Sequence, residues 1–110
     1  MYCYVWEFLV ADKHRRTFEA AYGPDGDWVR LFRNDPSYLR SFLLRDHDNA
    51  DHYLTMDYWL TRHAYLAFRE RFRSELDELD ARCAQWTSEE RCVGDFEMAD
   101  GSPEPPEKKR

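Results

Sequence analysis

Residues 58–68, YWLTRHAYLAF, place four aromatic side chains around one predicted junction between a strand and a helix. Trp59 and Tyr65 each combine a large apolar ring with one hydrogen-bond donor, so each needs a partner for its polar tip when it is buried. Two interpretations are open: these rings are ordinary core, or they line a pocket that holds a flat ligand. We expect Phe68 to be core, because large apolar residues follow it on one helical stripe, and we expect Trp59 and Tyr65 to border a cavity.

Glu7 is the one charged residue in the apolar segment 2–10, YCYVWEFLV. A buried carboxylate must be paired with a cation or be protonated. Glu7 is therefore either ion-paired with an Arg of a second subunit, for which Arg40 and Arg45 are candidates, or a base of raised pKa in a pocket. Of the two, the ion pair is the favoured interpretation.

The segment 46–52, DHDNADH, collects His and Asp residues that could be drawn as a metal cluster. It lacks the glycine and the terminal Glu of a calcium-binding loop, and its two His residues lack the spacing of a helical zinc site. We therefore expect a solvated hairpin turn here and no metal ion. Cys3, Cys83 and Cys92 form no CxxC pair, and their odd number predicts reduced structural thiols.

These residues depend on the elements that position them, and the first element is a strand over 2–10. One face carries Tyr2, Tyr4, Trp6, Phe8 and Val10, and the other carries Cys3, Val5, Glu7 and Leu9. A half-exposed strand would alternate with polar residues, so this strand is expected to be covered on both sides.

Capping residues predict where the helices begin and end. Asp12 is the predicted N-cap of a first helix that stops at Gly23, and Asp27 is the predicted N-cap of a short helix. Thr61 is the predicted N-cap of one long helix. The buried stripe of that helix is predicted at Tyr65, Phe68, Phe72, Leu76, Leu79, Cys83 and Trp86.

Strands are predicted over 38–45, 53–59 and 89–97, and the first two form a hairpin. The resulting order is typical of the α+β class and of the ferredoxin-like βαββαβ fold, with an extra short helix and a four-stranded antiparallel sheet. We assign residues 1–98 to this domain and residues 99–110 to a polar C-terminal tail. Because helices cover only one sheet face, the other apolar face is expected to pair with a second copy, as a homodimer.

The composition limits the classes of partner. The chain has 110 residues, a net charge of −6, 16% aromatic and 35% charged residues. An acidic body is repelled by nucleic acid and by anionic membranes, so we expect neither as a partner. No apolar run approaches the roughly 18 residues of a membrane span, and the first residues lack the basic start of a signal peptide. We expect a cytoplasmic protein.

The segments VWEFLV, FEAAYGPDGDW and YLTMDYWLTRHAYLAF resemble the antibiotic biosynthesis monooxygenase family, over roughly residues 2–97. The most specific element is a Trp that ends the third strand, followed by a small N-cap and an Ala–aromatic pair. In this chain these are Trp59, Thr61, Ala64 and Tyr65. The resemblance implies a dimeric α/β barrel.

One activity of the family is the cofactor-free oxygenation of anthrone-like or hydroquinone-like aromatics to quinones. Those enzymes carry an Asn four residues before the Trp, and they use the Trp and the helix Tyr to bind substrate oxygens. The chain matches at Trp59 and Tyr65 but has Thr55 in place of the Asn. A further helix Arg has no convincing match. Haem degradation, the family's other well-known activity, requires an Asn on the first strand and a late helix His; this chain has no Asn there, and His63 lies in the first turn.

The resemblance therefore implies a cofactor-independent monooxygenase that acts on a small polycyclic or quinol-type aromatic, without metal or flavin. The implied catalytic residues are Trp59 and Tyr65 as donors, Thr55 at the Asn position, and Glu7 or Asp57 as the base. The implied substrate-binding walls are Trp6, Trp28 and Phe68. The alternative is a non-catalytic dimeric ligand-binding or structural protein of the same fold, which the missing Asn favours.

The orientation of the third strand stays open at this point. Alternation places Tyr53, Thr55, Asp57 and Trp59 on one face and Leu54, Met56 and Tyr58 on the other. The second set is the more apolar and predicts the helix-facing core. The resemblance instead implies that Trp59 turns towards a cavity between the sheet and the helices.

Overall fold

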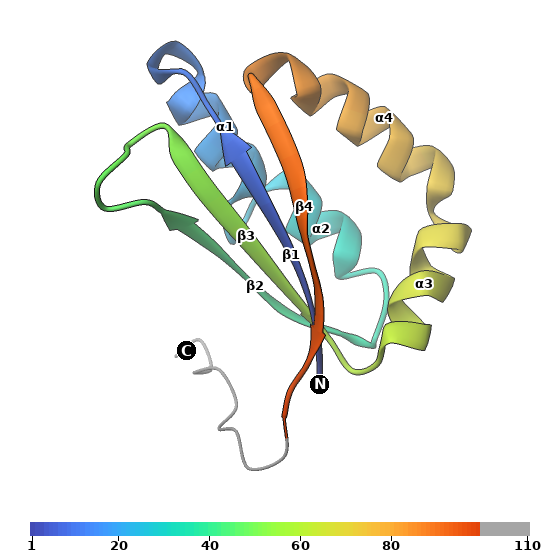
Figure 1. Cartoon of the computed structure of the whole chain (residues 1–110). Helices are drawn as coiled ribbons and strands as arrows, with labels where there is room; N and C mark the ends of the chain where they lie inside the picture. The colour runs from blue at the N-terminus through green and yellow to red at the C-terminus, as the bar shows by residue number, and fades with distance from the viewer. Residues whose placement is uncertain (100–110) are drawn as a thin grey trace.

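The computed structural model describes residues 1–99 and shows a four-stranded antiparallel sheet with helices packed against it (Figure 1). The strands are β1 (Tyr2–Leu9), β2 (Tyr38–Arg45), β3 (His52–Trp59) and β4 (Glu89–Glu97), in the spatial order β2-β3-β1-β4. The helices are α1 (Arg15–Tyr22), α2 (Asp27–Phe32), α3 (Arg62–Arg71) and α4 (Arg73–Cys83), with short 3-10 turns η1 (Asp12–His14) and η2 (Ala84–Trp86). The ferredoxin-like α+β fold with an extra short helix is confirmed. The predicted tail lies outside the described residues except for its first residue.

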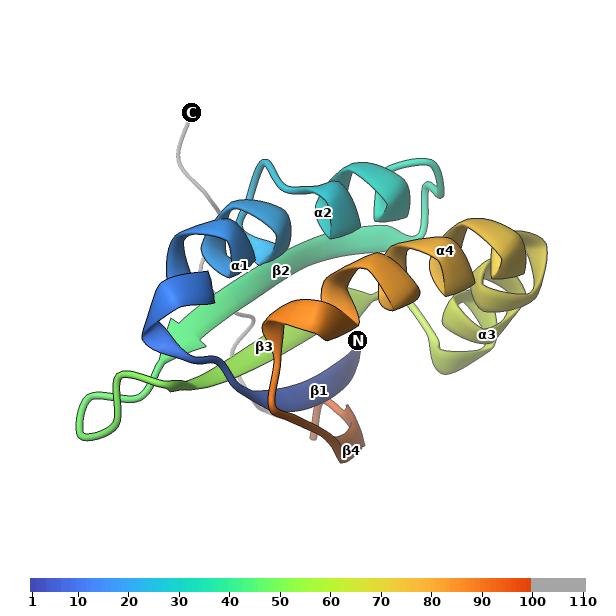
Figure 2. The ribbon, with the colours of Figure 1, turned by 90° about the horizontal axis from the view of Figure 1, so that it is seen from above.

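The helices cover one face of the sheet (Figure 2), and two buried clusters fill the space between these layers. One cluster surrounds Phe18 of α1 and includes Phe8, Tyr53 and Leu79. The other surrounds Trp59 and includes Phe32 and Phe68. Because β1 and β3 contribute to both clusters, the two central strands tie all the helices to one sheet.

β3 turns its less apolar set of residues towards the helices. Tyr53, Thr55 and Trp59 are buried there, whereas Tyr58 packs with Cys3 and Val5 on the open face of the sheet. The expectation that Leu54, Met56 and Tyr58 form the helix-facing core is therefore wrong. The number of apolar residues does not identify the helix-facing side of β3, because the open face of this sheet is itself apolar. The helix-facing side also includes polar residues that line a cavity.

Two of the three predicted N-caps are wrong. Asp12 lies inside η1 and accepts a hydrogen bond from Arg15 Nη1 at 2.7 Å, and Asp27 is the first residue of α2, whose N-cap is Gly26. Thr61 is confirmed as the N-cap of α3, because its Oγ1 accepts from the backbone N–H of Ala64 at 3.0 Å. Both Asp side chains bind Arg residues, which compete with the capping role.

The predicted long helix is divided at Phe72, whose φ of −109° and ψ of 26° leave the helical region. The break lets α3 bury Tyr65 and Phe68 in the Trp59 cluster while α4 directs Leu79 and Cys83 to the Phe18 cluster. Within residues 1–99, no helix is long and apolar enough to cross a bilayer.

Candidate functional site

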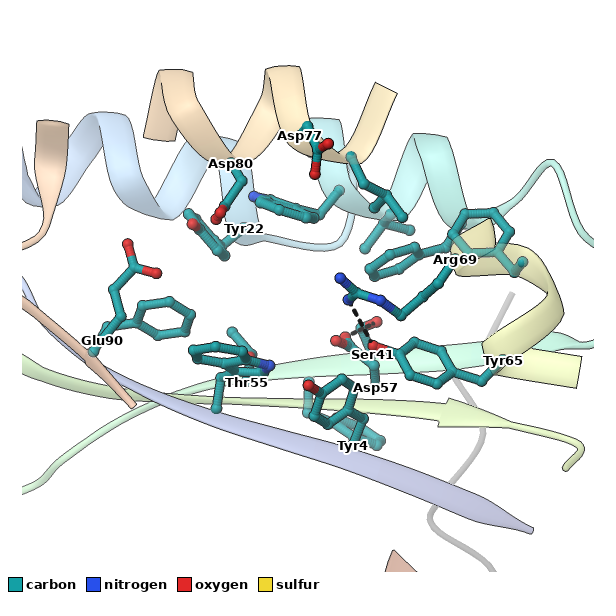
Figure 3. A pocket seen from close by; sticks show the side chains of 18 residues that line it. Tyr4, Tyr22, Ser41, Thr55, Asp57, Tyr65, Arg69, Asp77, Asp80 and Glu90 are labelled. Carbon is teal, nitrogen blue, oxygen red and sulfur yellow. Dashed lines mark hydrogen bonds between the residues drawn. The ribbon is translucent and has the colours of Figure 1, made fainter. Parts of the chain in front are cut away.

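A cavity of about 200 Å³ lies between the helix-covered face of the sheet and the helices (Figure 3). Its lining comes from β1, β2, β3 and β4 and from all four helices. Ligand pockets usually range over roughly 300–1,000 Å³. The smaller volume therefore favours a compact ligand of a few rings.

Asp57 is a carboxylate on the sheet side of this cavity, next to Ser41. In the β2–β3 register it pairs with Ser41, whose Oγ donates a hydrogen bond to Asp57 Oδ1 at 2.6 Å. Ser41 has one hydrogen and gives it to Asp57, so Tyr38 O–H must donate to Ser41 Oγ, at 2.7 Å. Burial raises the pKa of Asp57 to about 6, against the opposing effect of the Ser41 hydrogen bond. A carboxyl with this pKa can accept a proton near neutral pH.

Tyr65 and Arg69 lie one helical turn apart on α3 and point into the cavity from the side opposite the sheet (Figure 3). Arg69 Nη1 donates a hydrogen bond to the Tyr65 hydroxyl oxygen at 3.0 Å. Burial raises the pKa of Tyr65, and the Arg69 cation opposes that rise. The Tyr65 hydrogen is therefore free to bind a ligand oxygen, and Arg69 polarises the same hydroxyl.

The three walls predicted from the sequence all line the cavity: Trp6 from β1, Trp28 from α2 and Phe68 from α3. Tyr4, Phe8 and Tyr22 extend this aromatic surface. The ring centroids of Tyr4 and Tyr65 are 4.9 Å apart in an edge-on arrangement, so these two rings hold each other at the cavity edge.

Trp59 is not among the residues that line the cavity. It is fully buried, with ring centroids 5.3 Å from Tyr65 and 4.9 Å from Phe68. Its indole N–H has no hydrogen-bond partner among residues 1–99. The expectation that Trp59 borders the cavity is therefore wrong, because its ring forms a second layer behind Tyr65 and Phe68.

Glu7 lies on the open face of the sheet, on the opposite side from the cavity. Its carboxylate binds Arg91 of β4 at 3.0 Å and lies 3.6 Å from His52 Nε2. Arg45, one of the expected partners, instead contacts Glu19. The structure does not bring Glu7 to the candidate base position, since alternation along β1 directs odd-numbered residues away from the helices.

Thr55 lies on the cavity floor and is 7% exposed. Its register partners are Trp6 on β1 and Leu43 on β2, and neither of these side chains has a hydrogen-bond acceptor. Within residues 1–99 the Thr55 hydroxyl makes no side-chain hydrogen bond, and it is not among the sealed polar atoms that lack a partner. It is the position at which the resemblance implied an Asn.

Ser41 and Arg69 are site residues that the sequence did not identify. For Arg69 a signal existed, because it is the one nearby Arg at i+4 from Tyr65. For Ser41 the signal would have required the exact register of β2 against β3, which a long hairpin loop leaves undefined. The remaining border of the cavity is acidic, with Asp77 and Asp80 from α4 and Glu90 from β4. These elements are distant in the sequence from Asp57, so the sequence did not place them at the site.

In the described range 1–99, no group of three or more His, Cys, Asp or Glu residues is arranged to hold a metal ion. His52 in the hairpin instead binds Asp46 through Nδ1 at 2.8 Å, which raises the pKa of the imidazole. Cys3 and Cys83 are buried and Cys92 is exposed, all three as free thiols.

Comparison with solved structures finds the same fold in several proteins at low sequence identity. SnoaB from Streptomyces nogalater, a cofactor-independent oxygenase crystallised as a single-residue variant, is 20% identical with a TM-score of 0.71, over 94% of this chain and 97% of that chain. A candidate antibiotic biosynthesis monooxygenase from Nitrosomonas europaea is 18% identical with a TM-score of 0.68, over 89% and 98%. One from Deinococcus radiodurans is 9% identical with a TM-score of 0.70, over 96% and 100%. No protein-family model and no curated protein matches the chain.

Proposed function

We propose that this chain, which has the fold of the antibiotic biosynthesis monooxygenases, is a cofactor-independent monooxygenase that acts on a small polycyclic or quinol-type aromatic. One observation carries the proposal. A carboxyl of raised pKa, Asp57, faces the Tyr65–Arg69 pair across a cavity with aromatic walls. The pocket thus combines a base with donors for an oxyanion, and these are the protein groups that such a reaction requires.

Asp57 begins the reaction by removing a proton from the substrate, either from a phenolic hydroxyl or from an activated CH2 group. Ser41 occupies Oδ1, so Oδ2 is the oxygen that receives this proton. The electron-rich anion then reduces O2 and binds it at carbon. For an anthrone-type substrate, one oxygen atom ends in the new carbonyl and the other leaves as water, so the substrate supplies all the electrons.

Tyr65 and Arg69 stabilise the negative charge that develops on the substrate oxygen. The Tyr65 hydroxyl donates directly, and the Arg69 cation adds an attractive field in a site lined by rings. Preorganised donors of this kind are usually among the largest contributions to catalysis. Trp59 supports the pair by packing against Tyr65, and Thr55 stays available as an additional donor.

The direct test is oxygen consumption with a panel of anthrones and naphthohydroquinones, in protein freed of metal by a chelator. We expect quinone absorbance to rise and O2 to fall in equal amounts, and both to stop when O2 is removed. If every member of the panel binds without consuming O2, or if activity requires an added metal or flavin, the oxygenase proposal is wrong.

Tyr65→Phe is expected to weaken the binding of a quinone-like ligand while changing the free energy of unfolding by no more than about 1 kcal/mol. The variant keeps the ring that packs against Tyr4 and Trp59 and deletes only the hydroxyl. Ligand titration and urea denaturation measure the two effects. Destabilisation by several kcal/mol with unchanged ligand binding would show that the hydroxyl is a structural bond and not part of a binding site.

A non-catalytic ligand-binding protein of the same fold is the second candidate. Two observations favour it: Thr55 stands where the resemblance implied an Asn, and the indole N–H of Trp59 does not reach the cavity. In that case the ligand panel would bind and Asp57 substitutions would alter affinity, but no O2 would be consumed.

We also expect a homodimer, formed through the open face of the sheet. That face carries Cys3, Val5 and Tyr58, with Leu39, Phe42, Leu54 and Met56 packed against them. Light scattering should give about twice 13.4 kDa. Met56→Glu should yield a monomer, whereas Leu66→Glu, on the exposed surface of α3, should not. A monomeric wild-type protein would contradict this proposal.

A cytoplasmic location and the absence of nucleic-acid and membrane partners stay predictions from the sequence.

A further inference from the structure

The cavity has an acidic end opposite the Tyr65–Arg69 pair. Asp80 of α4 and Glu90 of β4 border the cavity there (Figure 3). Neither carboxylate forms an ion pair with another residue in the range 1–99, and Glu90 accepts one hydrogen bond, from Thr87 Oγ1 at 2.8 Å. By contrast, Asp27, which lies near the same helix, binds Arg82 at 3.0 Å. No ion pair within residues 1–99 neutralises either carboxylate, and the cavity cation that Asp80 acts on is Arg69, which is paired with Tyr65.

These charges act on the interior of the cavity and not only on solvent. Burial is the main cause of the raised pKa of Tyr22, and Cys83 and the charges of Glu90 and Asp80 raise it further. The Tyr22 ring lies 5.5 Å from Trp28 and 5.1 Å from Phe8, so aromatic rings border this end as well. Carboxylates combined with aromatic faces form an environment that attracts a cation.

The Thr55 hydroxyl provides an independent indication of a ligand. Thr55 is more than nine-tenths buried as a residue and lines the cavity, and its hydroxyl makes no hydrogen bond within residues 1–99. The hydroxyl oxygen is not among the sealed polar atoms of residues 1–99, so a ligand atom in the cavity can reach it and bind it. The hydroxyl lies between the two ends, because Thr55 is two residues from Asp57 on the same face of β3.

The strand register gives the length of the ligand. Asp57 pairs with Tyr4 of β1, and Glu90 pairs with Phe8 of the same strand. Four residues of an antiparallel strand span about 13–14 Å. The separation between the Asp57 and Glu90 positions fits a ligand of two fused rings that carries a polar group at each end. Each polar group would then form one hydrogen bond with the protein.

We propose that the cavity binds an elongated aromatic with an ionisable hydroxyl at one end, towards Asp57 and Tyr65, and a protonated amine at the other, towards Asp80 and Glu90. This substrate class rests on the proposed function, because it takes the hydroxyl end from the oxygenase site. A neutral analogue loses the charge attraction, and an analogue with a carboxylate is repelled by the same two residues. The acidic end therefore determines which aromatics enter.

The test uses three naphthols that differ at the ring position opposite the hydroxyl: aminomethyl, hydroxymethyl and carboxylate. Calorimetric titration should show the aminomethyl compound binding about 5- to 10-fold more tightly than the hydroxymethyl compound, and the carboxylate most weakly, as partly exposed charge pairs contribute modestly. In Asp80→Asn/Glu90→Gln the preference should disappear. The matched control is Glu78→Gln/Glu89→Gln, which removes the same amount of charge from neighbouring positions that do not line the cavity. This control should keep the preference for the aminomethyl compound.

Thr55→Val, which removes the hydroxyl and keeps the shape, should weaken all three compounds by a similar factor. Equal affinities in the wild type, or a preference lost equally in both double variants, would overturn the amine proposal. If the hydroxymethyl compound binds and Tyr65→Phe weakens it, the aromatic site stands even when the amine preference is absent. If none of the naphthols binds, both the site and the substrate class are wrong.

Discussion

Asp57→Asn is expected to lower the rate of quinone formation by about 10²–10⁴-fold, the usual contribution of a general base. The amide keeps the shape of the carboxyl and can still accept from Ser41, but it cannot take a proton from the substrate. Substrate binding should change much less than the rate. Asp25→Asn, at an exposed turn, removes the same charge and should leave the rate unchanged. A fully active Asp57→Asn protein would assign the base to another group.

The pH dependence of the rate and of the stability provides a second test of Asp57, by comparison of the wild type with Asp57→Asn. The base acts only when deprotonated, so the rate should rise with pH through about 6. The sign for stability is opposite: the folded state holds the proton to a higher pH than the unfolded chain, whose Asp has a pKa of about 3.9. Asp57 should therefore lower stability as pH rises from about 4 to about 6, and Asp57→Asn should remove that slope. An unchanged slope would show that another group titrates.

Phe68→Ala is expected to reduce the free energy of unfolding by about 3–5 kcal/mol, the usual loss for a large buried ring. Phe68 is 1% exposed and packs against Trp59 at 4.9 Å and Phe72 at 4.8 Å. It joins α3 to the sheet and supports the kink at Phe72. Its ring is therefore a core residue that also forms part of the cavity wall.

Urea denaturation measures this loss, with Leu66→Ala as the control on the same helix. Leu66 is 46% exposed, so its truncation should change stability by no more than about 0.5 kcal/mol. A loss below about 1 kcal/mol for Phe68→Ala would show that neighbouring side chains collapse into the space, which would also reduce the cavity.

The fold could be predicted because its main signals are local. Alternation along β1 and the 3.6-residue spacing of the stripe from Tyr65 to Cys83 are both readable in the sequence and both confirmed. The break at Phe72 could not be predicted, because no Gly or Pro marks it. Its consequence is visible only in the tertiary structure, where α3 and α4 pack into different clusters.

The site was predicted less well, for a related reason. Trp6, Trp28, Thr55, Asp57, Tyr65 and Phe68 do meet at the cavity, but Trp59 and Glu7 do not. Resemblance indicated the correct junction, yet whether an individual ring faces the cavity or the layer behind it depends on packing. Glu7 looked unusual only because the sequence does not show that Arg91 is its neighbour on β4.

The position of β1 has a consequence for how the chain reaches this structure. β1 is made first, but it lies inside the sheet and pairs with β3 and with β4, the last strand. Tyr2 pairs with both Trp59 and Glu97, so the contacts that fix the first strand are among the most distant in the sequence. During synthesis its apolar faces stay without their final neighbours until nearly the whole domain has left the ribosome. High contact order of this kind slows folding, and we expect a refolding time on the order of milliseconds to seconds.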